Sequence, residues 1–165
     1  MSGQPLYLLA MLLGYGVIVL IAGRLIRTNR DIKGSGIPQV EAELKGLLAV
    51  SWWDTLWKKY ILGVLAIGSG LMLGREGPSI QLGAMGGKGV AHHLKVSPVE
   101  ERSLIASGAA AGLAAAFNAP IAGLLFVVEE VYHHFSRFFW ISTLAASLTA
   151  NFISLNVFGQ TPVLH

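Results

Sequence analysis

An arginine and a glutamate, Arg75 and Glu76, stand side by side in the pentad GREGP, between the uncharged stretches 60–73 and 78–87. Acids inside membrane segments mark ion or proton pathways, and a carboxylate at a helix N-terminus can occupy the place of an anion until it is protonated. The pattern therefore favours Glu76 as a tethered competitor for a permeating anion. A simple ion pair with Arg75, or a loop at the membrane surface, is the alternative interpretation.

Three pentads share this form: GSGIP at 34–38, GREGP at 74–78 and AFNAP at 116–120. Each ends in a proline that can stand in the first turn of a helix, and small residues before it allow close backbone approach. A helix start carries unpaired N–H groups and the positive end of the dipole. Inside a membrane these donors must face protein, water or an anion. The pentads therefore predict an anion site built from broken helices, as in many transporters.

Glu129 and Glu130 end the apolar run IAGLLFVVEE and precede His133 and His134 by four residues each. This spacing would put metal ligands on one helical face, but a carboxylate-bridged di-iron site needs a second helix with further acids. The chain offers none, so no metal is expected. A polar helix end at the membrane interface is the alternative for Glu129.

Two enzyme-like features are weak. Ser35 raises the possibility of an intramembrane serine hydrolase, yet no Gly-x-Ser-x-Gly element is present. The run GAMGGKG at 83–89 resembles a phosphate loop in composition, but Lys88 is followed by Gly rather than Ser or Thr. Close helix packing explains the glycines better. We expect neither an enzyme nor a bound cofactor.

The composition of the chain is typical of a membrane protein. The chain is 53% hydrophobic and 13% charged, with a mean hydropathy of +0.60. The uncharged runs 1–23, 103–128 and 138–164 each reach the roughly 20 residues that cross a bilayer as a helix. Because backbone groups find no water in hydrocarbon, an all-α fold with several spans is predicted. The net charge of +3 comes mostly from residues between spans rather than from a nucleic-acid-binding surface, and with no cysteine there are no disulfides.

The predicted elements include half-length pieces. Basic residues after the first span place that segment in the cytoplasm by the positive-inside rule. Trp52, Trp53 and Trp57, with Lys58 and Lys59, are typical of an interfacial anchor. Pro120 should break the run that contains it. The predicted order is a span at 6–27, a short helix near 39–50, half-length pieces at 60–73 and 78–94, a polar link at 95–103, two pieces broken at FNAP, and a span at 138–158.

The motifs GSGIP, GREGP and GAAAGLAAAFNAPIAGLLFVVEE, in this order, closely resemble the CLC family of chloride channels and chloride/proton antiporters. The resemblance covers nearly the whole chain and implies chloride transport coupled to proton movement. It implies that Ser35 donates its hydroxyl to a central chloride, with backbone N–H groups around Gly36 and Ile37 beside it. It also implies that Glu76 is a gating glutamate that swings away when protonated.

The resemblance implies two further roles. Arg75 and Lys59 match positions that raise the positive potential around the pore. Glu130 is similar to the proton-transfer glutamate of the antiporters, which channels replace. A passive chloride channel is therefore the first alternative, and Glu130 argues against it.

The resemblance is limited to the first of two inverted halves, so residues 1–165 are expected to be a partial CLC transmembrane domain. The second half, with a tyrosine that helps to bind the anion, has no match here. We therefore expect a fragment or one part of a split transporter, with a second-half segment or chain as partner and a homodimer as the complete protein. A multi-pass location in the cell (inner) membrane is expected. A membrane fragment without transport activity is the remaining alternative.

Overall fold

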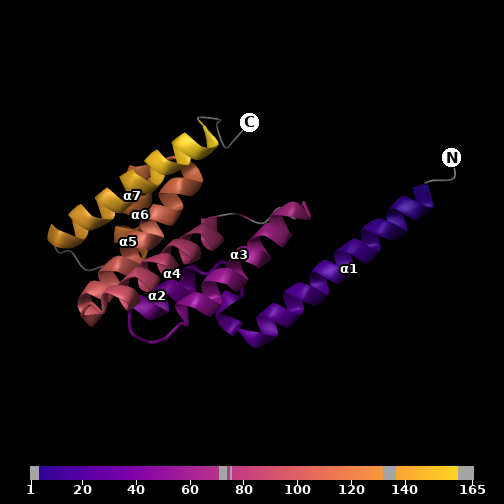
Figure 1. The fold of residues 1–165 in the computed structure, drawn as a ribbon, viewed down its shortest axis with the longest axis horizontal. Coiled ribbons are helices and arrows are strands. Elements are labelled where there is room, and N and C mark those ends of the chain that lie inside the picture. Colours follow the sequence, from indigo (N-terminus) through magenta and orange to yellow (C-terminus); the bar gives the residue numbers. More distant parts are fainter. Residues whose placement is uncertain (1–3, 71–73, 75, 132–136, 160–165) are drawn as a thin grey trace.

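The computed structural model describes residues 4–70, 74, 76–131 and 137–159, and these residues form helices and connecting turns without a strand (Figure 1). The predicted all-α architecture with broken helices is confirmed. The elements are α1 (Gln4–Thr28), η1 (Arg30–Ile32), α2 (Ile37–Leu44), α3 (Trp52–Gly68), α4 (Glu76–Leu94), α5 (Pro98–Phe117), α6 (Pro120–Phe126), the π-helix η2 (Val127–Val131) and α7 (Arg137–Phe158).

Helix α1 stands apart from the cluster of α4 to α7 (Figure 1). Of the helices that the structure describes, it alone has an 18-residue window, Met11–Thr28, that is apolar enough by length and composition to cross a membrane. Its described contacts with α3 include a hydrogen bond from the Tyr15 hydroxyl to the Ser69 carbonyl at 2.8 Å. The predicted first span at 6–27 is therefore confirmed to within two residues at each end.

Among the elements that the structure describes, α4 and α5 form the most extensive contact, and glycine makes it possible. Gly83 of α4 and Gly108 of α5 face each other, and a Cβ on either would collide with the carbonyl oxygen of the other. Small residues let membrane helices approach to backbone contact in this way. Helix α7 packs on α5 partly through hydroxyl groups, with the Ser107 and Thr143 oxygens 3.0 Å apart.

The short helix predicted near 39–50 is observed at Ile37–Leu44 and ends before Gly46, whose φ of +74° is left-handed. Two further predicted boundaries are wrong. Helix α3 begins at Trp52, so the tryptophan cluster forms its first turns. Of the piece predicted at 60–73, residues 60–68 are the rest of this 17-residue helix, and 71–73 lie outside the described residues. Trp53 and Trp57 are exposed, whereas Trp52 is half-buried in the direction of Gly89 of α4. One ring of the supposed anchor thus packs inside the protein.

The second wrong boundary is the polar link predicted at 95–103, because α5 already begins at Pro98. Ser97 and Glu100 form a capping box, in which the Glu100 N–H donates to the Ser97 hydroxyl at 3.4 Å and the Ser97 N–H donates to the Glu100 carboxylate at 2.9 Å. The Ser97 hydroxyl also donates to this carboxylate at 2.7 Å. These hydrogen bonds from the Ser97 side chain and backbone hold the pKa of Glu100 below its usual range. The prediction of a link rests on four charged residues, at 95 and 100–102. The pattern Ser-x-x-Glu in the same segment is, however, a signal for the start of a helix.

Candidate functional site

The start of α2 has backbone N–H groups that find no partner within the helix. Gly36 caps the helix with a φ of +98°, a left-handed conformation that glycine adopts without strain, and Pro38 stands in the first turn. The first intrahelical bond runs from the Val40 N–H to the Gly36 carbonyl at 3.1 Å. The N–H groups before Val40 have no partner within the helix, so this end carries the positive pole of the dipole.

A buried lysine holds the segment that leads into α2. The Lys59 ammonium, on α3, donates to the carbonyl oxygens of Ile32 at 3.1 Å and Gly34 at 2.8 Å, and the residue is 3% exposed. A buried cation of this kind raises the positive potential near the α2 N-terminus. The structure thus places Lys59 beside the loop that is predicted to bind the anion.

Helix α4 packs its first two turns against the same segment. A Cβ on Gly77 would lie 2.5 Å from the Ser35 carbonyl oxygen and 2.7 Å from the Ser35 Cβ, so only glycine allows this approach. One turn later, Gln81 lies against Gly36. Since Glu76 immediately precedes Gly77, the start of α4 that carries the predicted gating acid packs against the predicted anion-binding serine.

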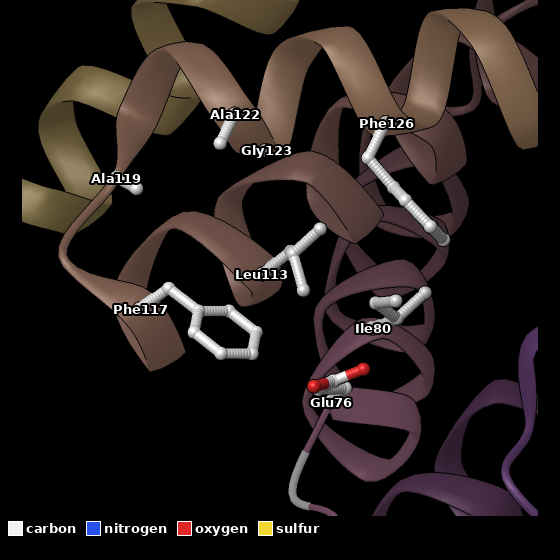
Figure 2. A pocket seen from close by; sticks show the side chains of 8 residues that line it. All are labelled: Glu76, Ile80, Leu113, Phe117, Ala119, Ala122, Gly123 and Phe126. Carbon is white, nitrogen blue, oxygen red and sulfur yellow. The ribbon is translucent and has the colours of Figure 1, made fainter. Parts of the chain in front are cut away.

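Glu76 also lines a pocket of about 220 Å³ between α4, α5 and α6 (Figure 2). Figure 2 shows its carboxylate near Ile80 on the α4 side of the pocket, with the ring of Phe117 on the α5 side. Glu76 is the charged member of the lining, and the other lining residues are apolar. Glu76 itself is exposed, so it borders the pocket rather than filling it. Burying an ionised carboxylate among apolar side chains is costly. The lining comprises Glu76, Ile80, Leu113, Phe117, Ala119, Ala122, Gly123 and Phe126.

No described contact joins the other predicted site residues to Ser35, Gly77 or Glu76. Glu129 and Glu130 are exposed in the π-helix η2, directly after α6. Arg75, His133 and His134 lie outside the described residues. Within the part of the chain that the structure describes, no group of three His, Cys, Asp or Glu residues is arranged to hold a metal ion.

Sequence reasoning missed an ion pair between α2 and α4. The Lys88 ammonium contacts the Glu43 carboxylate and donates to the Val50 carbonyl at 2.6 Å, while the Val50 N–H donates to Glu43 at 3.3 Å. Burial raises the pKa of Glu43, and the hydrogen bond from Lys88 opposes that rise. Lys88, considered for a phosphate loop, instead ties α4 to the C-terminal end of α2. The sequence signal for this ion pair is that Lys88 is a charged residue within the glycine-rich run 83–89, where a buried lysine needs an acidic partner.

Sequence comparison decides the family. Residues 17–165 match the family model described as voltage gated chloride channel. The chain belongs to this family. The resemblance to CLC proteins that the three pentads indicate is therefore confirmed, and with it the membrane character of the chain.

Named relatives of this CLC chain are exchangers. It is 41% identical over 168 residues to the H(+)/Cl(-) exchange transporter ClcA of Vibrio campbellii, covering 99% of this chain and 36% of the relative. It is 44% identical over 136 residues to the H(+)/Cl(-) exchange transporter ClcA of Salmonella arizonae, and the match covers 79% of this chain and 28% of the relative. A crystal structure of a slow cyanobacterial Cl-/H+ antiporter matches with a TM-score of 0.86 and 36% identity, covering 94% of this chain and 37% of that one. The chain thus spans about a third of the length of these relatives.

Proposed function

We propose that this protein forms the anion-binding part of a CLC-type exchanger that moves chloride in one direction and protons in the other. The observation that carries the proposal is the contact between Ser35 and Gly77, which sets the start of α4, with Glu76, beside the start of α2. The names of the relatives support exchange as the activity.

Chloride binds, in this proposal, to the Ser35 hydroxyl and to the backbone N–H groups around Gly36 and Ile37. The dipole of α2 favours an anion at this end, and Lys59 adds a buried positive charge nearby. Arg75 is proposed to add to the same positive potential. The site needs no cofactor, because N–H and O–H donors suffice to replace water around a chloride ion.

Glu76 is proposed to act as the gate. When ionised, its carboxylate competes with chloride for the positive helix starts; when protonated, it loses that attraction and fits the apolar pocket beside Ile80 and Phe117. A proton from one side of the membrane thereby frees the anion path. This links chloride binding to protonation, which exchange requires.

Glu130 is proposed to pass protons between Glu76 and the cytoplasm. It is exposed at the end of the apolar segment that begins with α6, where water can reach a carboxylate. The exchange cycle belongs to the complete assembly, for which we propose a homodimer in the cell (inner) membrane. A second segment or chain, equivalent to the remaining length of the relatives, completes each pore.

A flux experiment tests the proposed function. The natural assembly, in which a second segment or chain completes the pore, is reconstituted in sealed vesicles and should drive protons against their gradient when a chloride gradient is imposed. Chloride movement that leaves the external pH unchanged would identify a passive channel instead. Absence of both movements, with folded protein in the vesicles, would contradict transport by this protein.

A further inference from the structure

Gln81 is a fully buried polar residue on α4 that the chemistry described so far does not use. It is 0% exposed, and its side chain faces the segment that leads into α2. Its amide N–H donates to the Asp31 carbonyl at 2.8 Å. A buried side-chain amide without a structural or functional reason is costly in a membrane protein, where apolar residues would serve as filling.

The other end of the Gln81 side chain abuts the cap of α2. Its amide oxygen has no hydrogen-bond partner and is buried. A Cβ added to Gly36 would collide with this oxygen and would lie 2.7 Å from the Gln81 Cβ. The donated hydrogen bond to Asp31 fixes which way the amide points, because the NH₂ end must face the carbonyl. Gln81 thus contacts the leading segment at two points.

Gln81 and Lys59 together engage carbonyl oxygens on one stretch of backbone. Gln81 binds that of Asp31, and Lys59 binds those of Ile32 and Gly34. A carbonyl oxygen carries the negative end of the peptide dipole and repels an anion. Donors from α3 and α4 therefore hold these oxygens toward themselves, while the N–H groups that follow at the start of α2 stay free for an anion.

We infer that Gln81 is a positioning residue for anion binding: it holds the backbone from Asp31 to Gly36 so that the start of α2 presents donors rather than carbonyl oxygens to chloride. This inference rests on the proposed chloride site at Ser35, Gly36 and Ile37. It adds a specificity determinant that touches the backbone of the site and acts through it.

The first test is Gln81→Met, which keeps the side-chain volume and removes the donor. Chloride affinity of the natural protein and of the variant is measured by isothermal titration calorimetry. We expect the affinity to fall about three- to tenfold, the effect of one neutral hydrogen bond. Met85→Leu is the matched control, a volume-conserving change one turn later on α4 at a residue that is 1% exposed. It should leave chloride affinity unchanged.

The second test gives a readout that loss of packing alone would not produce. In Gln81→Glu the ionised carboxylate cannot donate to Asp31, but the protonated carboxyl group can. Chloride affinity, expressed as a ratio to the natural protein at the same pH, should be lowest at pH 7.5 and recover toward one at pH 5. Asp31, Lys59 and Glu76 are present in both proteins. The effect of their titration on chloride affinity therefore cancels when the ratio is taken at one pH.

Ser35→Ala separates this inference from the proposed function. Weaker chloride binding in both Ser35→Ala and Gln81→Met supports the inference. Weaker binding in Ser35→Ala with unchanged binding in Gln81→Met rejects the role of Gln81 and leaves the chloride site in place. Unchanged binding in both variants rejects the site itself. A Gln81→Glu ratio that stays constant between pH 7.5 and pH 5 also rejects the positioning role; if that variant does not fold, Gln81→Met decides alone.

Discussion

At the scale of single residues, Glu76 lies between two environments. It begins α4 close to the start of α2, and it lines the apolar pocket beside Ile80 and Phe117. Its side chain is exposed at this position. In the proposed gate, the ionised carboxylate competes with chloride at the helix starts and the protonated group enters the pocket.

Replacing this acid by its neutral isostere should fix the gate open. We expect Glu76→Gln to retain chloride flux and to lose the dependence of that flux on pH, because glutamine mimics the protonated carboxyl group. The measurement is chloride efflux from liposomes between pH 4.5 and pH 7.5. Glu101→Gln, in the first turn of α5, is the control and should keep the natural pH dependence. A Glu76→Gln variant with the same pH dependence as the natural protein would remove Glu76 as the gate.

Ser35 should decide how well chloride is preferred over nitrate. Ser35→Pro removes both the hydroxyl and the N–H donor, and losing one hydrogen bond to a charged ligand costs about 1.5–3 kcal/mol. We expect chloride to be weakened relative to nitrate by at least about tenfold, measured as the ratio of the two fluxes. Ser35→Ala, which keeps the N–H, should show a smaller loss. An unchanged flux ratio in folded Ser35→Pro would exclude Ser35 from the site.

At the scale of elements, the site depends on close contact between helices. Gly77 lets α4 reach the loop before α2, and Gly83 lets α4 meet α5 at Gly108. The pocket beside Glu76 lies between α4, α5 and α6, so the spacing of these helices also sets its shape.

The contact between α4 and α5 should tolerate no added methyl group at its closest point. Gly83→Ala is expected to destabilise the protein by about 1–3 kcal/mol, the usual cost of overpacking. Gly86→Ala, on the same helix with nothing within 4 Å of the added Cβ, should be neutral or slightly stabilising, because alanine favours the helix. Thermal unfolding in detergent compares the two. Equal unfolding temperatures for Gly83→Ala and Gly86→Ala would contradict the prediction, because they would show that α4 and α5 can move apart at low cost.

The elements show what sequence can predict here. Pro120 indicated the break after Phe117, because a proline cannot continue a helix interior, and the break is found there. The GSGIP and GREGP pentads indicated helix starts close to Ile37 and Glu76, as observed. The start of α3 was misplaced, because tryptophans and lysines suit both a membrane interface and a helical turn. The roles of Gln81 and Glu43 could not be predicted, since they arise only when α4 meets α2 in space.

At the scale of the whole molecule, the chain presents much apolar surface. In α1, Leu12 is 72% exposed and Leu20 is 74% exposed, which suits contact with lipid or with other parts of an assembly. The chain spans 36% of the length of its Vibrio campbellii relative. The exchange cycle is therefore proposed for the assembly in which this chain works, and it must couple two ions across the whole membrane.

Coupling is the central claim, and a matched pair of variants tests it most directly. A chloride gradient is imposed across sealed vesicles that contain the natural assembly, and external chloride and pH are recorded together. We expect Glu130→Gln to keep chloride flux and to lose proton counter-movement, because a neutral amide cannot pass a proton. Its neighbour Glu129→Gln should keep both movements. Proton counter-movement that survives in Glu130→Gln would contradict the account.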